Sequence, residues 1–409
     1  MRTTVENLLK DNILKQIIIF TLILFFLGCS KEDTVNTLDD SALISESESI
    51  ENKITVTNDE KNDSLGSFLF LEMLEAQIDT MTKRSLVEPY YYQQWYLEHN
   101  ETFYMQNGID PDANIHTNNL LNFYTGKGVK IAIIDDGLDV LHEDLNGSII
   151  NTFDIATQTT DVSHKSEYGF HGTSVTGIIG ARVNGKGIHG IASESEIIFI
   201  KHQNLMSDSE TIELFSQAEA FGADIINCSW GTYDVSEAVK EKIQDLAVNG
   251  RDSKGILIIF AVGNDNINMG NDESAIPEVI AVGASDKENL RAWYSNFGEH
   301  LDILAPGGYD IGLTTLDTMG SDGISSLDQN YLLYDDFNSF IGTSASAPIV
   351  SGVIALMLEA DPSLSRVEIE EILKNTSDKI GGVGYENLRN DYYGYGKINL
   401  NNIMNFLNQ

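Results

Sequence analysis

Short apolar runs in the middle of the chain constrain its fold more than any other feature. Each run is continuous rather than alternating with polar residues, which is typical of parallel strands covered on both faces. The runs cover 129–134, 196–200, 223–228, 256–262 and 279–282, and helix candidates at 171–180, 207–220 and 236–248 lie between them. We therefore predict a doubly wound α/β domain with a mainly parallel sheet, helices on both faces, and functional groups at the carboxyl ends of the strands.

A second constraint is the stretch 342–348, Gly-Thr-Ser-Ala-Ser-Ala-Pro, which leads into a run of small apolar residues. A glycine turn that enters a buried helix leaves Ser344 at the helix N-terminus, where unpaired N–H groups and the helix dipole favour a developing anion. This position suits a nucleophile. It also suits an ordinary N-cap serine on a core helix, so this stretch alone leaves both interpretations open.

Polar side chains upstream decide between these interpretations. Asp135 directly follows the run 129–134, His171 opens a helix candidate, and Asn264 follows the run 256–262. Acyl transfer by serine needs an imidazole to take the hydroxyl proton and a buried carboxylate to orient that imidazole. It also needs preorganised donors for the oxyanion, here the Asn264 amide and the Ser344 N–H. The set therefore predicts nucleophilic catalysis by Ser344.

The motifs IAIIDDG, HGTSVTG, AVGN and GTSASAP stand in the order found in subtilisin-like serine proteases, and the chain resembles that family over about 91–400. The resemblance implies a serine endopeptidase that hydrolyses peptide bonds through an acyl-enzyme. It assigns Asp135 as the orienting carboxylate, His171 as general base and acid, Ser344 as nucleophile and Asn264 as oxyanion donor. The alternative is a non-catalytic surface protein that uses the same fold for binding.

Within the family, the chain looks most similar to the kexin-like proprotein-processing branch. A second acid, Asp136, follows the catalytic one, and the segment after the run 223–228 is implied to pair with the substrate backbone through Ser229, Trp230 and Gly231. In kexins, acids at the positions of Asp136 and Asp234 bind basic side chains, as carboxylates in a partly closed pocket do. The resemblance thus predicts cleavage after basic or dibasic residues. The alternative is a broad-specificity protease in which both acids are solvated.

The family resemblance also implies a structural calcium ion. Glu88, Asp144 and Asn184 match positions that supply oxygen ligands in relatives, and oxygen ligands from separate segments suit a hard cation. Each acid considered alone could equally be a solvated surface residue. The chain departs from the kexin pattern at Asn296, which stands where that branch has a metal-binding acid.

The N-terminus has the features of an export signal. Basic residues precede the apolar stretch 16–28, and Cys29 follows it in a run that resembles a lipobox, although Phe26 replaces the usual leucine. We predict a signal peptide at 1–28, an acidic flexible stalk at 29–65, a short pre-domain segment at 66–87 and the peptidase domain at 88–409. One interpretation of the pre-domain segment is a remnant prosegment. A plain secretory peptide or an uncleaved anchor is the alternative.

This arrangement predicts an exported protein that is lipid-anchored through Cys29 at the bacterial cell envelope, at the outer membrane or the cell surface. The dibasic pair Lys83-Arg84 lies just before the predicted domain, where self-processing would release the enzyme from its lipid. After lipidation only Cys228 remains as a free thiol, so we expect no intramolecular disulfide.

The charge balance limits the possible partners. The chain has 25 Lys and Arg against 62 Asp and Glu residues, a formal net charge of −37. Such a charge repels nucleic acid and anionic membranes, so we expect membrane contact only through the lipidated N-terminus. It attracts cations and basic peptides, although acidity also serves solubility alone. The predicted partners are protein or peptide substrates.

Overall fold

The structure is a computed structural model, and it describes residues 88–164 and 169–409. The predicted signal peptide, stalk and pre-domain segment, with Cys29 and Lys83-Arg84, lie outside the described residues.

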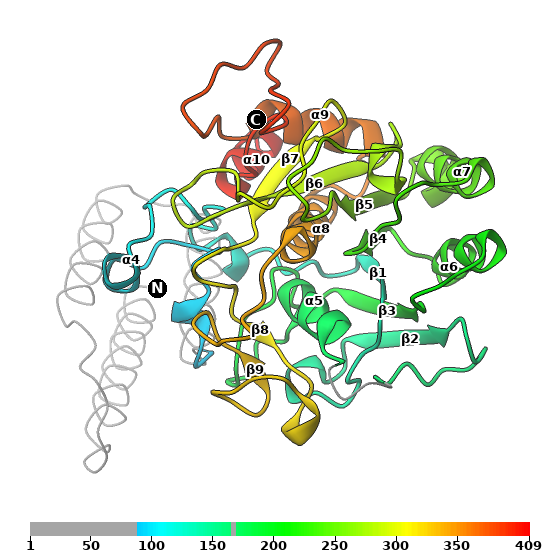
Figure 1. The fold of residues 1–409 in the computed structure, drawn as a ribbon, viewed down its shortest axis with the longest axis horizontal. Helices are drawn as coiled ribbons and strands as arrows, with labels where there is room; N and C mark the ends of the chain where they lie inside the picture. Colours follow the sequence, from blue (N-terminus) through cyan, green and yellow to red (C-terminus); the bar gives the residue numbers. More distant parts are fainter. Residues whose placement is uncertain (1–87, 165–168) are drawn as a thin grey trace, which may run out of the picture. The chain divides into compact units, whose positions relative to one another are not determined.

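One sheet of parallel strands organises the described chain, with the strand order β2-β3-β1-β4-β5-β6-β7 (Figure 1). A separate antiparallel pair is formed by β8 and β9. The strands are β1 (Lys130–Asp135), β2 (Ile149–Asp154), β3 (Glu196–Lys201), β4 (Ile225–Cys228), β5 (Leu257–Ala261), β6 (Ile280–Ser285), β7 (Ile303–Pro306), β8 (Thr315–Leu316) and β9 (Tyr331–Leu332).

Helices cover both faces of this sheet, so the predicted doubly wound α/β fold is confirmed. Helices α5, α8, α9 and α10 pack on one face, and α6 and α7 pack on the other. The α-helices are α4 (Glu101–Asn107), α5 (His171–Gly180), α6 (Asp208–Ala220), α7 (Glu237–Ser253), α8 (Thr343–Ala360), α9 (Arg366–Thr376) and α10 (Leu400–Leu407). Short 3₁₀ turns lie at Tyr91–Gln93, Leu120–Asn122, Glu143–Leu145, Glu273–Ala275 and Gly320–Asp322.

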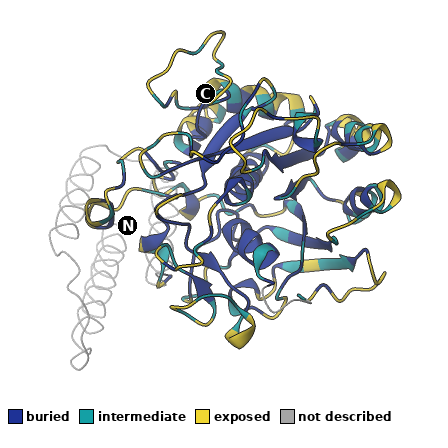
Figure 2. Cartoon of the chain, in the orientation of Figure 1, coloured by how far each residue is buried: buried dark blue, intermediate teal, exposed yellow. Residues whose placement is uncertain are grey.

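The continuous apolar strands follow from this double coverage. In β1, Ile131 and Ile133 join the core cluster that contains α5 and α8, whereas Ala132 and Ile134 join the cluster that contains α6 and α7. Successive side chains of a strand point to opposite faces, so both parities must be apolar when both faces are buried. Figure 2 shows this burial along the central strands.

The sheet edges and one helix end differ from the sequence prediction. The strands β2 and β7 were not predicted. Because β2 lies at an edge, its residues are partly exposed and polar. In β7 only three apolar residues stand between Asp302 and Pro306, so the sequence shows no longer apolar run there. Helix α6 begins one residue after its cap Ser207, which forms a capping box with Glu210. Helix α7 is assigned as far as Ser253, beyond the predicted end at 248, but its backbone is not helical at Gly250.

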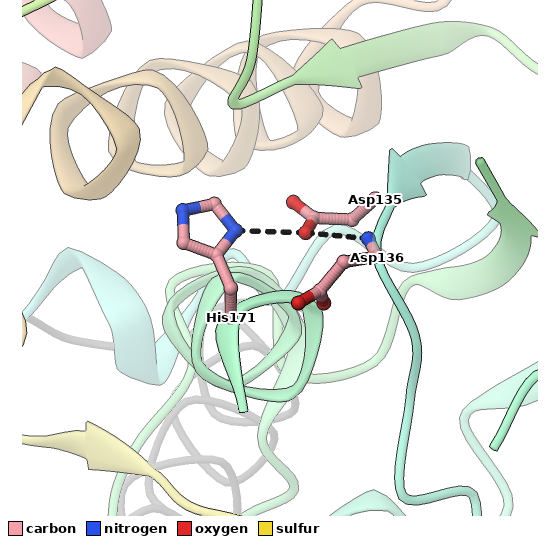
Figure 3. Close-up of side chains that lie close together, drawn as sticks. All are labelled: Asp135, Asp136 and His171. Carbon is pink, nitrogen blue, oxygen red and sulfur yellow. Dashed lines mark hydrogen bonds and ion pairs between the residues drawn. The ribbon is translucent and has the colours of Figure 1, made fainter. Parts of the chain in front are cut away.

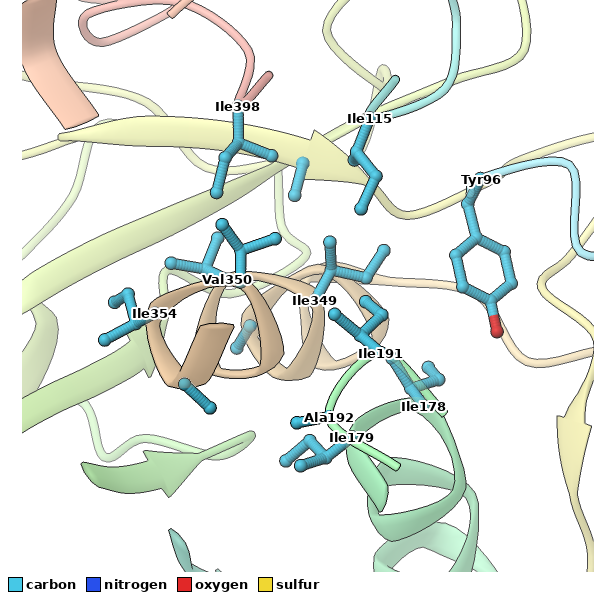
Figure 4. Packing of buried hydrophobic residues seen from close by; sticks show 14 of the residues in the cluster. Tyr96, Ile115, Ile178, Ile179, Ile191, Ala192, Ile349, Val350, Ile354 and Ile398 are labelled. Carbon is cyan, nitrogen blue, oxygen red and sulfur yellow. The ribbon is translucent and has the colours of Figure 1, made fainter. Parts of the chain in front are cut away.

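Helix α8 is the centre of the larger core. Its Ile349, Val350 and Ile354 lie in one cluster with Ile178 of α5 and with Ile398 near the C-terminus (Figure 4). The helix is long and apolar enough to cross a membrane, but 83% of it is buried inside the protein. It is therefore the core helix of the domain, and its first turn carries Ser344.

Candidate active site

Strand β1 and helix α5 bring Asp135 and His171 together. Asp135 is the last residue of β1 and is buried, and His171 is the first residue of α5. His171 Nδ1 and Asp135 Oδ1 are 2.7 Å apart, and the Asp136 N–H donates to the same oxygen at 2.8 Å (Figure 3). The second ring nitrogen points away from Asp135 (Figure 3). The carboxylate thus fixes the imidazole tautomer and leaves one nitrogen for chemistry.

The charges of this pair stabilise each other. Burial lowers the pKa of His171, but the charge of Asp135, its hydrogen bond and the charge of Asp136 outweigh burial and raise that pKa to about 8. Burial raises the pKa of Asp135, but the charge and hydrogen bond of His171 outweigh it and hold that pKa below its usual value. The site therefore supports an imidazolium, the species that forms when His171 has taken a proton.

Ser344 lies in the first turn of α8, after Gly342, whose φ of 123° is in the range that favours glycine. Its Oγ donates to the Ser229 carbonyl oxygen at 2.9 Å. The expected hydrogen bond between Ser344 Oγ and the His171 ring is not found among the described residues. The hydroxyl has a single proton, and here that proton is held by the neighbouring carbonyl.

A proline explains why Ser229 and Ser344 are joined twice. Pro348 has no N–H, so the Ser344 carbonyl, four residues earlier in α8, lacks its usual helix partner. Ser229 Oγ donates to that carbonyl at 3.0 Å. The start of α8 is therefore attached to the end of β4 by two reciprocal hydrogen bonds.

Asn264 follows β5 and faces the same helix start. Its Oδ1 accepts hydrogen bonds from the Thr343 N–H at 2.9 Å and from Thr343 Oγ1 at 3.0 Å. Thr343 Oγ1 in turn accepts from the Gly263 N–H at 3.2 Å. Because Oδ1 is occupied, Nδ2 is the free end of the amide, and neither it nor the Ser344 N–H has a hydrogen-bond partner in the part of the chain that the structure describes. Two donors are thus available beside Ser344.

The predicted substrate edge directly follows β4. Ser229 is buried and hydrogen-bonded to Ser344, and Trp230 Nε1 donates to the Ile134 carbonyl at 2.9 Å. The Trp230 ring packs against Phe260, with centroids 5.4 Å apart. Gly231 is exposed. The backbone at this edge is therefore fixed on its inner side and open on its outer side.

Glu273 supports this edge and was missed by the sequence analysis. It is buried, and its Oε2 accepts from the Thr232 N–H at 2.9 Å. Thr232 Oγ1 donates to the same carboxylate at 3.0 Å. An acid in a polar loop carries no local signal of burial, so only the fold identifies this contact.

The two acids predicted to read basic side chains lie in different surroundings. Asp136 Oδ1 accepts from the Gly172 N–H at 3.0 Å and lies 3.7 Å from His164 Nδ1. Burial and the charge of Asp135 raise the pKa of Asp136 to about 6. Asp234 is exposed, and its Oδ1 accepts from Asn271 Nδ2 at 2.9 Å. The structure thus places Asp136 beside Asp135 and His171, and Asp234 on the open loop after the edge.

The three predicted calcium ligands converge in another region. Glu88 Oε1 accepts from the Asn184 N–H at 2.6 Å and the Gly185 N–H at 2.8 Å. Three oxygens remain buried with no hydrogen-bond partner, namely Glu88 Oε2, Asp144 Oδ1 and Asn184 Oδ1. Burial raises the pKa of Glu88, and burial with the charge of Glu88 raises the pKa of Asp144 to about 7. One unpartnered oxygen on each of two carboxylates, together with one amide oxygen, fits a hard cation such as Ca²⁺.

Comparisons with known proteins agree with this geometry. A model of the subtilase family matches residues 126–396. A calcium-dependent protease of Nostoc sp. is 34% identical over 339 residues, which cover 75% of this chain and 50% of that protein. Subtilisin Savinase of Lederbergia lenta is 30% identical over 282 residues, which cover 67% of this chain and 90% of that protein. The chain spans about half the length of the first of these relatives.

Solved structures support the fold independently. The serine protease of Aeromonas sobria, solved in complex with a chaperone, superposes with a TM-score of 0.67 at 22% identity, covering 78% of this chain and 66% of that chain. At an identity this low, the similarity supports only a shared fold. The family match covers more than half of the residues, so the chain belongs to the subtilase family.

Proposed function

We propose that this chain is a serine endopeptidase that cleaves peptide bonds through an acyl-enzyme. The observation that carries the proposal is the 2.7 Å contact between His171 Nδ1 and Asp135 Oδ1. The free Nδ2 of Asn264 and the N–H of Ser344 complete the set of groups that acyl transfer requires. The relatives named as proteases support the same activity.

The residues divide the reaction between them. A substrate strand pairs with the edge at Ser229 to Gly231, and Ser344 Oγ turns from the Ser229 carbonyl toward His171, since catalytic hydrogen bonds often tighten only in the substrate complex. The hydroxyl attacks the scissile carbonyl while the free nitrogen of His171 takes its proton. Asn264 Nδ2 and the Ser344 N–H stabilise the oxyanion. His171 then protonates the leaving amine, and water hydrolyses the ester by the same route.

Labelling with a fluorophosphonate tests this proposal. We expect covalent modification at Ser344 that is lost in the His171→Ala variant, because the hydroxyl needs its base. The competing hypothesis, a binding protein on a subtilase fold, draws on the absence of a hydrogen bond between Ser344 and His171 among the described residues. An unlabelled wild-type protein would favour that hypothesis and overturn the proposed activity.

We also propose a preference for cleavage after basic residues, with Asp136 and Asp234 as the selecting acids. The support is their charge and their positions beside His171 and after the substrate edge. Profiling the purified enzyme against a peptide library tests the preference. Equal cleavage after Leu, Phe and Arg would instead favour the broad-specificity alternative.

A structural calcium ion is the third part of the proposal. Glu88, Asp144 and Asn184 would hold it through the buried oxygens that have no other partner. The ion would neutralise two like charges brought together in the interior, which stabilises the fold around Glu88. Relatives named calcium-dependent proteases support this assignment.

For localisation, we propose export and lipid anchoring at the cell envelope through Cys29, followed by release through cleavage at Lys83-Arg84. The support is the sequence alone. N-terminal sequencing of the wild-type protein beside the Ser344→Ala variant tests the release step. A new terminus at Ser85 in the wild type alone would support self-cleavage, and the same terminus in both proteins would contradict it.

A further inference from the structure

We propose that Asn296 is a positioning residue for the oxyanion donor Asn264. This inference rests on the proposed peptidase function and concerns how its oxyanion site is held in place. In the sequence, Asn296 stands out only because the kexin-like branch has a metal-binding acid at its position. The structure gives this residue a different environment.

Asn296 is almost fully buried and bonds to the backbone on both sides of Asn264. Its Nδ2 donates to the Val262 carbonyl at 2.8 Å, and its own N–H donates to the Gly263 carbonyl at 3.0 Å. On the far side, its Oδ1 accepts from the Asp265 N–H at 3.0 Å and from the Ile267 N–H at 3.1 Å. Asn264 therefore sits in the middle of a loop whose two arms are attached to one side chain.

The amide is the side chain that this position requires. It must donate to a carbonyl at one end and accept from two N–H groups at the other, and a carboxylate at neutral pH has no proton to donate. Gly263 fits closely against it, since a Cβ on Gly263 would lie 2.6 Å from Asn296 Nδ2, with a φ of 94° that also favours glycine. The buried anchor at Val262 is itself paired, through its N–H, with the Val282 carbonyl of β6 at 3.1 Å. The loop is thus attached to the sheet.

A second restraint acts on Asn264 from the opposite direction. Thr343 holds its Oδ1, which orients the side chain, whereas Asn296 holds the backbone from which that side chain extends. Both are needed for an oxyanion donor, because such a donor acts only when it is preorganised at the position of the developing charge. Without Asn296, the N–H groups of Asp265 and Ile267 lose their acceptor and the loop is free to shift. A displacement of about 1 Å at a catalytic group is enough to cost on the order of 100-fold in rate.

The test is a double-mutant cycle between the two asparagines. We expect Asn296→Ala to lower kcat by about 10-fold to 100-fold, with KM changed less than about twofold, when rates are normalised to fluorophosphonate-titrated active sites. In an Asn264→Ala background the same substitution should lower kcat by less than about twofold, because the donor that it positions is already gone. Affinity for a peptide aldehyde, whose adduct carries the oxyanion, should fall in step with kcat in Asn296→Ala.

Asn114 offers a matched control. It is also a buried asparagine that holds a loop, accepting from the His116 N–H at 2.7 Å and donating to the Pro111 carbonyl at 3.0 Å. Its contacts do not involve any residue of the proposed site. We expect Asn114→Ala to lower the thermal midpoint while leaving kcat for each titrated site unchanged. This separates loss of stability from loss of positioning.

Asn296→Asp serves if the alanine variant does not fold. It keeps an oxygen that accepts from Asp265 and Ile267 but replaces the donor to Val262 with a second carboxylate oxygen, which repels the Val262 carbonyl. We therefore expect a loss in kcat of about tenfold or more that is again absent in the Asn264→Ala background. The positioning role is wrong if the losses in kcat multiply in the double variants, or if kcat is unchanged in the single variants, while the wild-type protein still hydrolyses peptides. A wild-type protein with neither hydrolysis nor labelling would overturn the proposed function and this inference with it.

Discussion

Replacing Asp144 with asparagine should stabilise the metal-free protein and remove most of the stabilisation that calcium provides. Asp144 Oδ1 is buried without a hydrogen-bond partner, and burial together with the charge of Glu88 raises the pKa of Asp144 to about 7 from an ordinary value of 3.8. The folded metal-free protein therefore holds a proton there more tightly than the unfolded chain does. Its free energy of unfolding falls as the pH rises from about 4 to about 7 and stays low at higher pH.

The size of the effect follows from that shift. A difference of about 3 pKa units corresponds to about 4 kcal/mol of destabilisation at pH 8, where the carboxylate is ionised in both states. Asparagine carries no charge, so it does not carry the free-energy cost of burying an ionised carboxylate. Asp144→Asn should therefore raise the free energy of unfolding in chelator by up to about 4 kcal/mol. For a domain of this size, that is a rise of roughly 6 °C in the thermal midpoint.

Calcium should remove most of the stability difference between the two proteins. Binding to the folded state at a thousandfold excess over Kd stabilises by about 4 kcal/mol, and the variant, which lacks one anionic ligand, should gain much less. The assay is calorimetry at pH 8 in EDTA and in calcium, with Ser344→Ala in every sample to prevent self-digestion. Asp234→Asn is the control, because this exposed acid should change neither midpoint.

Two results would refute the reasoning. A variant that is less stable than the wild type under both conditions would mean that burial does not penalise the Asp144 carboxylate. A wild-type midpoint that calcium leaves unmoved would mean that the unpartnered oxygens around Glu88 do not form a cation site.

Three further outcomes follow from the site. In the pH–rate profile, kcat/KM should rise with pH through about 8 as His171 loses its proton. Asp136→Asn should move this rise to lower pH, because the charge of Asp136 helps to raise the pKa of His171. A rise that stays at the same pH in the variant would contradict this. Steady-state kinetics of Asn264→Ala should show kcat lower by about 100-fold to 1,000-fold with little change in KM, and a loss confined to KM would argue against an oxyanion role. Glu273→Ala should raise KM by about 10-fold and lower kcat by a smaller factor, because Thr232 and the substrate edge lose a hydrogen-bond acceptor. A large fall in kcat with little change in KM would instead mean that Glu273 takes part in the chemical step.

The sequence predicted the centre of the fold better than its periphery. Strands such as β1 and β5 are buried on both faces, so their composition reveals them without knowledge of their neighbours. The edge strand β2 is stabilised by pairing with β3 rather than by its own apolar residues, so its sequence resembles a loop. Its position follows only from the assembled sheet.

The same distinction holds for the site. Asp135 and His171 stand at the ends of regular elements, and the rule that strand ends gather at one edge of a parallel sheet predicts that they meet. The supports of the site behave differently. Asn296 contacts a loop 31 residues away in the chain, and Glu273 contacts Thr232 across 41 residues, so no local pattern marks either contact. These contacts depend on how loops return to one another after the sheet has formed.

The place of α8 in the chain order has a consequence for when the proposed active site can form. Every strand of the sheet precedes this helix in sequence, and the helix fills the larger core. A nascent chain that has emerged only as far as β7 carries the acid, the imidazole and the amide but no nucleophile, and its main apolar interior is still empty. The groups of the proposed site can therefore come together only after α8 has been synthesised and has packed into the core.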